Sequence, residues 1–310
     1  MIRAIDLFAG IGGIRLAFEN SNTEFVFTSE IDKFARTTYE ANFQDNFPIQ
    51  EDITKIEAKD IPDFDLLLAG FPCQPFSNAG LKRGFEDTRG TLFFDIARIL
   101  AEKQPQAFML ENVKGLITNN KGDTFKTILN ILQNDLNYKI YYTVLDAKDF
   151  GLPQHRERLI IVGFKNHDVD FHFPQAPKTE TKMKDILEPK VDDKYTLSDK
   201  MWNCLLEHKK RHEEAGHGFG YGLLDDNSSY SRSLLARYYK DGSDILIKQN
   251  NKNPRKLTPR ECARLQGFPD TFILPCSNTQ TYKQLGNSVP VPMIKAIANE
   301  IYKVLEVNND

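Results

Sequence analysis

Short apolar segments alternate with amphipathic segments over the first 165 residues of the chain. The apolar segments are typical of buried strands, which we predict over residues 3–8, 25–29, 64–69, 107–110, 139–145 and 159–164. The amphipathic segments predict helices over residues 14–20, 32–42, 92–103 and 124–132. Strands that alternate with helices indicate an α/β fold built on a parallel, doubly wound sheet.

The pattern changes after residue 171. Prolines at positions 174, 177 and 189 interrupt a polar stretch without a clean period, which is typical of a linker and an irregular module. An apolar helical period returns over residues 283–305, and we expect it to pack back on the first unit. Because 310 residues exceed what one core usually holds, we predict a larger domain of residues 1–180, completed by 281–310, and a smaller domain of residues 181–280.

The composition is that of an ordinary globular protein, with 40% hydrophobic and 27% charged residues. The sequence has no apolar run near the roughly 18–20 residues of a membrane span, and Asp6 interrupts any apolar core of a signal peptide. The four cysteines have no paired spacing, which is typical of a protein of the reducing cytoplasm and not of one stabilised by disulfides. We therefore expect a cytoplasmic protein with no membrane association.

The charge is unevenly distributed. A net charge of −3 by itself argues against a nucleic-acid partner. Residues 228–264, however, contain nine Lys and Arg against three acidic residues. Such a run usually forms a solvated face, but the interleaved Tyr230, Tyr238 and Tyr239 favour a nucleic-acid surface.

A glycine-rich turn over residues 8–13 separates the first predicted strand from the first predicted helix. Glycines allow the backbone to approach a ligand closely, and the start of the helix offers free N–H groups. Glu30 ends the second predicted strand, where a carboxylate can accept both ribose hydroxyls, and Asp52 could hold an adenine amino group. Structural glycines alone would explain the turn, but the turn, Glu30 and Asp52 together favour an adenosine-type cofactor.

Cys73 follows the predicted strand 64–69, at the sheet edge where open α/β folds place their ligands. A single cysteine is usually a small buried hydrophobic residue. Pro72 and Pro75, however, prevent regular structure on both sides and favour a thiol presented on a rigid turn. The other cysteines have no comparable context, and we interpret them as structural.

Charged residues also lie at the ends of two later strands. Glu111 closes the strand 107–110, where partial desolvation would raise its pKa toward that of a useful general acid. Arg156 and Arg158 precede the last strand and supply fixed cations, although alternating charges at a strand entrance are often only solvated.

With these features together, the chain resembles a DNA cytosine carbon-5 methyltransferase of the bacterial restriction–modification type. The combination of Pro-Cys-Gln, Glu-Asn-Val and Gln-x-Arg-x-Arg is highly specific. The blocks that match the family, in the family's order, are residues 6–13, 70–77, 111–113, 154–164, 255–268 and 284–290. The resemblance implies a Rossmann-like S-adenosylmethionine-dependent sheet in the larger domain, with residues 181–280 as a smaller, irregular target-recognition domain.

The resemblance also implies a mechanism. Cys73, as thiolate, would add to carbon 6 of cytosine and make carbon 5 nucleophilic. Glu111 would bond ring nitrogen 3, and Arg156 and Arg158 would face the pyrimidine carbonyl or a nearby phosphate. Carbon 5 would take the methyl group of S-adenosyl-L-methionine, leaving S-adenosyl-L-homocysteine, without a metal. The expected cofactor residues are Phe8, Gly10, Gly12, Glu30, Ile31, Asp52, Ile53, Pro72, Leu92, Asn287 and Ser288.

The expected partner is double-stranded DNA, from which the target base must be flipped. A basic loop after Cys73 has the composition of one that closes over a flipped nucleotide, and residues 216–240 should read the sequence. Arg232 and Arg237 could each contact guanine or a phosphate equally well. The expected DNA-binding residues are Ser77, Lys82, Arg83, Arg89, Arg232, Ser233, Arg237 and Tyr238. A cognate restriction endonuclease would be a functional partner.

Other interpretations are weaker. A related transfer-RNA methyltransferase would share the catalytic blocks, but the module at 175–250 favours duplex DNA. A non-catalytic DNA-binding protein would not need Cys73 or Glu111, and a nicotinamide dehydrogenase is suggested only by the glycine turn. The series Cys204, His208, His212 and His217 could suggest zinc, but its spacing is explained more simply by an amphipathic helix with a solvated face.

Overall fold

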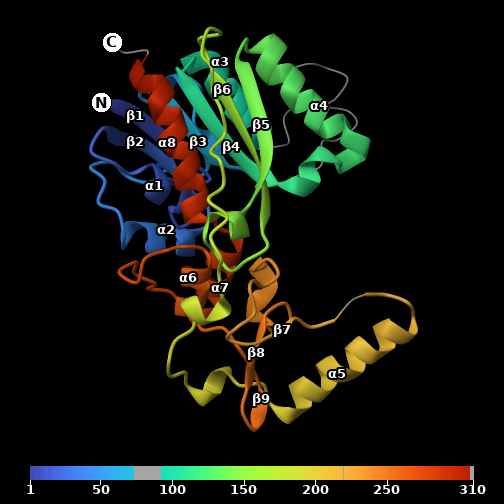
Figure 1. Ribbon diagram of the computed structural model, residues 1–310. Helices are drawn as coiled ribbons and strands as arrows, with labels where there is room; N and C mark the ends of the chain where they lie inside the picture. Colours follow the sequence, from blue (N-terminus) through green and yellow to red (C-terminus); the bar gives the residue numbers. More distant parts are fainter. Residues whose placement is uncertain (73–91, 219, 308–310) are drawn as a thin grey trace.

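The computed structural model describes residues 1–72, 92–218 and 220–307 (Figure 1). A six-stranded sheet in the order β2-β1-β3-β4-β6-β5 forms the upper part of the molecule in this view. Its strands are β1 (Ile2–Leu7), β2 (Thr23–Ser29), β3 (Leu66–Gly70), β4 (Ala107–Val113), β5 (Lys139–Asp146) and β6 (Glu157–Phe164). All the strands predicted over the first 165 residues are confirmed, with boundaries that differ by a few residues.

The prediction of an entirely parallel sheet is wrong for β6. Strands β2, β1, β3 and β4 are parallel neighbours, whereas β6 runs antiparallel to both β4 and β5. The physical reason is the connection between β5 and β6, which spans only residues 147–156. A parallel crossover needs a dozen or more residues, usually with a helix.

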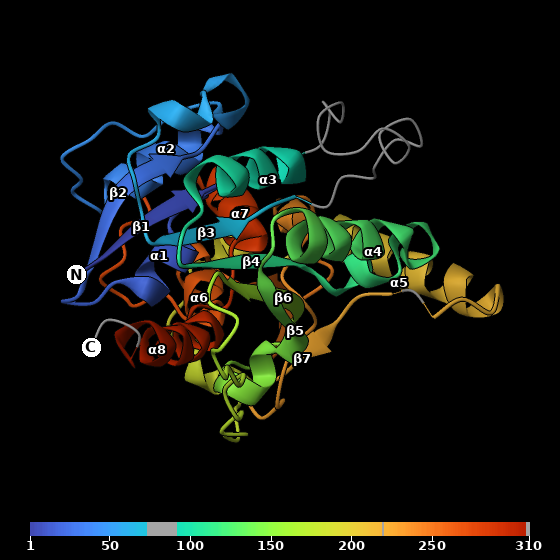
Figure 2. The same cartoon turned by 90° about the horizontal axis from the view of Figure 1, so that it is seen from above.

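Helices cover both faces of the sheet, as Figure 2 shows from above. Successive strand residues point to opposite faces, so that Leu66 and Leu68 belong to one buried cluster and Leu67 and Ala69 to the other. The first cluster includes α1 (Gly13–Phe18), α2 (Lys33–Glu40) and α8 (Val291–Val307). The second includes α3 (Leu92–Lys103) and α4 (Asp123–Asn130).

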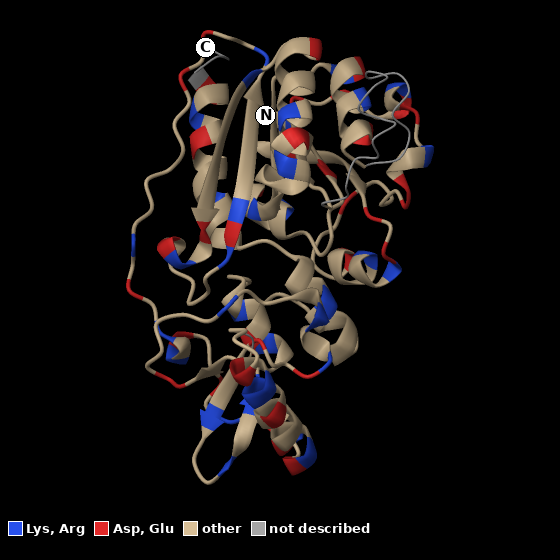
Figure 3. Cartoon of the chain, turned by 90° about the vertical axis from the view of Figure 1, so that its right-hand side faces the viewer, with Lys and Arg blue, Asp and Glu red and all other residues tan. Residues whose placement is uncertain are grey.

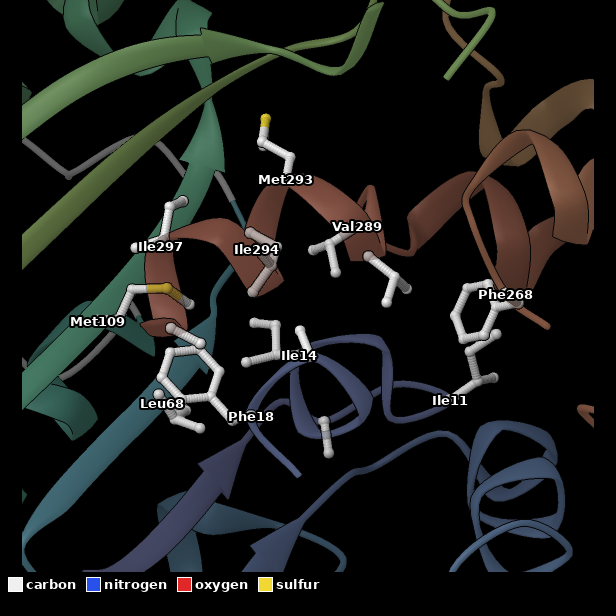
Figure 4. Packing of buried hydrophobic residues seen from close by; sticks show 14 of the residues in the cluster. Ile11, Ile14, Phe18, Leu68, Met109, Phe268, Val289, Met293, Ile294 and Ile297 are labelled. Carbon is white, nitrogen blue, oxygen red and sulfur yellow. The ribbon is translucent and has the colours of Figure 1, made fainter. Parts of the chain in front are cut away.

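The C-terminal segment returns to the sheet, as predicted, but as two helices rather than one. Helix α7 (Asn278–Asn287) ends before Pro290, whose missing N–H and fixed φ suit a helix start, and α8 follows it. Figure 4 shows Ile294 of α8 facing Ile14 of α1, and Met293 and Ile297 belong to the same buried cluster. The last helix thus closes the sheet face that carries α1.

The remaining elements form the lower part of Figure 1. They are α5 (Asp199–Glu214), α6 (Pro259–Leu265) and the strands β7 (Leu223–Leu224), β8 (Leu246–Gln249) and β9 (Lys252–Lys256), which form a small sheet. Helix α5 contains no buried residue, whereas α6 and β8 share the buried cluster that includes α8. The division into domains at residues 181–280 stays a prediction. Over the described ranges, no helix combines the length and apolarity needed to cross a membrane.

Candidate active site

A pocket of about 530 Å³ lies at the carboxyl ends of β1, β2, β3 and β4. This is the edge at which open α/β sheets bind their ligands. The pocket brings together the glycine-rich turn, the ends of three further strands and segments more than 200 residues away in the chain. Of the predicted catalytic and cofactor residues, those lining it are Phe8, Gly10, Glu30, Ile31, Asp52, Ile53, Pro72, Leu92, Glu111, Arg156, Arg158, Asn287 and Ser288.

Gly12 is the one predicted cofactor residue that does not line the pocket. Its φ of +84° is in the left-handed region, and a Cβ there would lie 2.2 Å from the ring of Phe43. Gly12 therefore permits the turn and its packing, while Gly13 lines the pocket in its place.

The carboxylate of Glu30 is held by two backbone amides. Its Oε2 accepts from the N–H of Gly10 at 2.7 Å, and its Oε1 accepts from the N–H of Asp32 at 2.7 Å. Burial raises the pKa of Glu30, and these hydrogen bonds oppose the shift. Each oxygen keeps a lone pair, so that the fixed carboxylate can accept hydroxyl groups from a ligand. The neighbouring Ile31 exposes 69% of its surface and gives the pocket an apolar rim.

Asp52 is a second acid at the same end of the pocket. Its Oδ1 accepts from the hydroxyl of Thr54 at 2.7 Å, and its Oδ2 lies 3.4 Å from Nζ of Lys55. The hydrogen bond from Thr54 is the largest of the effects that lower the pKa of Asp52. This carboxyl therefore stays ionised at neutral pH and can accept from an amino group.

Glu111 also lines the pocket, near the end of β4, and is 8% exposed. Its Oε1 lies 2.8 Å from Nε of Arg158, at the start of the antiparallel neighbour β6. Burial raises the pKa of Glu111, although Arg158 and Arg156 oppose that shift. A buried carboxyl with a raised pKa and an oriented partner is suited to hydrogen-bond or protonate a ligand.

Asn112 connects this acid with the strand that leads to Cys73. Its Nδ2 donates to the carbonyl of Phe71 at 2.9 Å, which ties the end of β4 to the segment after β3. Cys73 itself lies outside the described residues, as do Ser77, Lys82, Arg83 and Arg89. The described chain reaches Pro72, which lines the pocket beside Glu111.

The structure gives Arg156 a different role from the predicted contact with a base or phosphate. Arg156 contributes to the pocket wall but is only 1% exposed. Its guanidinium donates to the backbone carbonyls of Leu234 at 2.8 Å and Gly286 at 2.9 Å. A third hydrogen bond goes to the carbonyl of Ser288 at 2.5 Å. These bonds commit Nη1 and Nη2 to backbone carbonyls, so that of the two predicted arginines only Arg158 contacts an acid of the site.

The predicted DNA-binding residues beyond the pocket lie in a segment beside it. Arg232 and Arg237 are exposed, whereas Ser233 is half-buried and donates to the carbonyl of His155 at 3.1 Å. The DNA contact of Tyr238 stays a prediction, and in this structure its side chain is only 1% exposed. Its hydroxyl donates to the carbonyl of Ile245 at 2.7 Å and accepts from a backbone N–H at 2.8 Å. In Figure 3, Lys and Arg also lie on the small sheet, whereas α5 carries both signs of charge.

Several residues of the pocket were not predicted. Gln284 begins the matching block 284–290, so its position in that block was an available signal. Leu235 and Ala236 lie in a segment without a regular period, where no local signal identifies a lining residue. The pocket-lining residues of segments 235–236 and 280–289 that were not predicted are Leu235, Ala236, Gln280, Lys283, Gln284, Gly286 and Val289.

The histidine series does not form a metal cluster in the described part of the chain. His208 and His212 have their Nε2 atoms 3.1 Å apart on α5, and Cys204 is exposed. Among the described residues, no group of three or more His, Cys, Asp or Glu is arranged to hold a metal ion. That the protein uses no metal stays a prediction.

Comparisons with known proteins agree with this architecture. The chain matches the family model of the C-5 cytosine-specific DNA methylase over residues 2–303. It is 59% identical over 310 residues to the Type II methyltransferase M.SsoII of Shigella sonnei, covering 98% of this chain and 81% of that protein. It is 57% identical over 312 residues to the Type II methyltransferase M.NlaX of Neisseria lactamica, covering 100% of this chain and 99% of the relative.

Solved structures with the same fold are more distant in sequence. The methyltransferase EhMeth of Entamoeba histolytica superposes with a TM-score of 0.78 at 22% identity, covering 98% of this chain and 99% of that one. The Dnmt2 methyltransferase of S. pombe gives a TM-score of 0.77 at 22% identity over the whole of both chains. At this identity the likeness shows the fold alone, and it confirms the predicted methyltransferase sheet.

Proposed function

Because the chain belongs to the C-5 cytosine-specific DNA methylase family and is a DNA (cytosine-5-)-methyltransferase, we propose that it is the modification enzyme of a Type II restriction–modification system. It transfers a methyl group from S-adenosylmethionine to carbon 5 of a cytosine within a short site of double-stranded DNA. The observation that carries this proposal is the shared pocket, in which Glu111 and Arg158 lie in one cavity with Glu30 and Asp52.

The residues at one end of the pocket fit the proposed cofactor. Glu30 is fixed by the amides of Gly10 and Asp32 and can accept the ribose hydroxyls. Asp52 is ionised and can accept from the adenine amino group, while the exposed Ile31 offers the ring an apolar surface. When bound, S-adenosylmethionine supplies an electrophilic methyl group. None of the steps below requires a metal ion.

The proposed chemistry uses Cys73, Glu111 and Arg158. The thiolate of Cys73 forms a bond to carbon 6, and the electron pair of the C5–C6 double bond moves to carbon 5. Glu111 hydrogen-bonds ring nitrogen 3 and neutralises the charge that develops there, while Arg158 holds the Glu111 carboxyl. After methylation, carbon 5 loses its proton, the double bond re-forms and the bond to the Cys73 sulfur breaks.

A cytosine inside a duplex cannot reach a buried carboxyl such as Glu111. We therefore propose that the target base is flipped out of the helix, at a cost of about a few kcal/mol in stacking and pairing. The exposed Arg232 and Arg237 would contact the flanking duplex. Methylation of the site would protect host DNA from a cognate endonuclease in the same cytoplasm.

Methyl transfer and covalent catalysis can be tested together. Purified protein is incubated with radiolabelled S-adenosylmethionine and either unmodified duplex DNA or transfer RNA, and label in each nucleic acid is counted. We expect labelled DNA, no labelled RNA, and no turnover by Cys73→Ala despite intact duplex binding. Label in RNA alone would refute the DNA substrate, and turnover by Cys73→Ala would refute the covalent step.

The protective role has a separate test. Bisulfite sequencing of DNA from cells that express the protein identifies the methylated site. We expect that DNA to resist an endonuclease that cuts the same site, whereas DNA from cells expressing Cys73→Ala should be cut. Cleavage of both DNAs would contradict protection.

A further inference from the structure

A buried polar junction lies where four distant segments of the chain meet. Gln154 and Arg156 come from the connection between β5 and β6, and Gln266 follows α6; all three are at most 1% exposed. The amide Nε2 of Gln154 donates to the carbonyl of Leu265 at 3.1 Å, and that of Gln266 donates to the carbonyl of Leu285 at 2.8 Å. The chemistry proposed above assigns no role to this junction.

The junction holds residue 234 by both of its backbone polar groups. The N–H of Leu234 donates to Oε1 of Gln154 at 2.8 Å, and its carbonyl accepts from Nη1 of Arg156 at 2.8 Å. Leu234 lies two residues after Arg232 in the segment proposed to contact DNA and precedes Leu235 and Ala236, which line the pocket. The position of this segment is therefore fixed by two side chains from outside it.

The same guanidinium holds a wall of the cofactor pocket. Nη2 of Arg156 donates to the carbonyls of Gly286 at 2.9 Å and Ser288 at 2.5 Å. Asn287 lies between these two residues, and Asn287 and Ser288 line the pocket. One rigid, planar group thus connects the segment beside the DNA with the turn beside the cofactor.

The two segments also pack directly against each other at Gly286. A Cβ on Gly286 would lie 2.4 Å from the backbone carbon of Leu235 and from the backbone nitrogen of Ala236. Packed interiors transmit such displacements because they contain few voids. A shift of residues 234–236 on contact with DNA must therefore be accompanied by a shift of residues 286–288.

We propose that Arg156 is a positioning residue that couples DNA binding at residues 232–237 to cofactor binding at residues 286–288. The inference rests on the proposed function, because it requires both ligands to bind. Coupling is reciprocal, so that DNA should tighten cofactor binding by the same factor by which the cofactor tightens DNA binding. Lysine at this position keeps the charge but lacks the planar fork that reaches carbonyls of both segments.

The test measures binding of radiolabelled S-adenosylhomocysteine by equilibrium dialysis, with and without excess unmodified plasmid DNA. For the wild type we expect DNA to lower the Kd by about 5- to 150-fold, the usual range of coupling between sites. For Arg156→Lys we expect the ratio of the Kd without DNA to the Kd with DNA to fall to within about two-fold of one. Because Arg156 also holds the carbonyls of Gly286 and Ser288, the Kd without DNA should rise as well. A merely structural defect would instead raise the Kd by the same factor with and without DNA, and the ratio of the two values would stay as in the wild type.

Arg260→Lys is the matched control. Arg260 also donates to two backbone carbonyls, those of Pro269 at 3.2 Å and Phe272 at 2.8 Å, but it touches neither of the coupled segments. We expect this variant to keep the wild-type ratio. Coupling that survives Arg156→Lys, or that is lost equally in Arg260→Lys, would overturn the proposal. Failure of the wild type to bind either ligand would instead refute the proposed function.

A second measurement needs no variant. Hydrogen exchange of the wild type, followed by mass spectrometry, should show slower exchange of residues 285–288 when plasmid DNA is added without cofactor. Residues 233–236 should in turn exchange more slowly when S-adenosylhomocysteine is added without DNA. If each ligand protects only its own segment, the two are not coupled and the proposal fails.

Discussion

The pocket at the sheet edge and the segment at residues 228–240 hold their functional side chains in opposite ways. In the pocket, Glu30 and Glu111 each have a fixed partner and are largely buried. In the other segment, the Arg237 side chain is 69% exposed, and its nearest acidic partner, Asp244, lies 3.8 Å away. Bond-making requires groups that are already oriented, whereas contact with DNA can use long side chains that adjust on binding.

The same difference separates the arginines. Arg158 binds Glu111, the proposed catalytic acid, and Arg156 binds three carbonyls, so the guanidinium groups of both are held in place before any ligand arrives. Arg232 and Arg237 remain on the surface. Changes in the pocket should therefore affect rate or cofactor affinity directly, and changes in the exposed segment should act first on DNA affinity.

Among changes to the described residues, the largest effect is expected for Glu111→Gln. Loss of a positioned acid typically lowers the rate by about 10²- to 10⁴-fold, and here it also removes the ion pair with Arg158. Single-turnover methylation of duplex DNA should show this loss, while DNA binding in a mobility-shift assay is kept. The control Glu157→Gln changes a partly exposed acid paired with Lys114 and should retain nearly full activity. Equal loss in both variants would contradict the assignment.

Asp6→Asn tests whether the buried carboxyl group of Asp6, in β1, lowers the free energy of unfolding when it is ionised. Asp6 is fully buried, neither of its carboxyl oxygens has a hydrogen-bond partner among the described residues, and burial raises its pKa to about 8. Between pH 4 and pH 8 the folded state keeps a proton that the unfolded state releases, so stability falls as the pH rises through this window.

We therefore expect the stability advantage of Asp6→Asn over the wild type to grow between pH 5 and pH 9 by on the order of a few kcal/mol, since one pKa unit corresponds to about 1.4 kcal/mol. Urea unfolding at the two pH values measures this difference. The control Asp63→Asn, whose side chain is 78% exposed, should show no such change. A wild type that gains stability relative to Asp6→Asn at pH 9 would reverse the assigned sign.

A smaller effect is expected for Glu30→Gln. The amide keeps the shape of the carboxylate but loses an acceptor and the charge, and such hydrogen bonds contribute about 1.5–3 kcal/mol. The Kd for S-adenosylhomocysteine should rise about ten- to hundred-fold, with kcat at saturating cofactor nearly unchanged. Glu24→Gln, an exposed acid on the same strand, is the control. A fall in kcat without a change in Kd would place Glu30 outside the cofactor site.

The smallest effect is expected for Arg237→Ala, compared with Tyr238→Phe. Removing the exposed cation should weaken duplex binding by up to about ten-fold, and a lost phosphate contact would reduce the salt slope by about one. Tyr238→Phe should leave DNA binding unchanged but lower stability by about 1–3 kcal/mol, because a buried N–H loses its acceptor. Mobility-shift assays of both variants measure duplex binding, and urea unfolding of both variants measures the free energy of unfolding. A binding defect in Tyr238→Phe at full stability would restore that residue to the DNA surface.

The sequence by itself determined most of the sheet and the ends of its strands. Apolar runs and helical periods depend on neighbouring residues, so they identified β1 to β6 and α1 to α4 without knowledge of distant contacts. The carboxyl ends of parallel strands share one edge, which is why Glu30 and Glu111 could be placed in one site. The matching blocks added Asn287 and Ser288, which no local pattern identifies.

Only the tertiary structure decided the direction of β6 and the roles of individual side chains around it. Arg156 and Arg158 are alike in sequence, but Arg156 precedes β6 and meets carbonyls 78 and 130 residues away. Arg237 and Tyr238 are adjacent, yet one is exposed and the other buried, because a short helical turn at Ala236–Tyr239 directs them apart. Local rules specify local conformation, whereas these roles depend on which distant segments pack against each side chain.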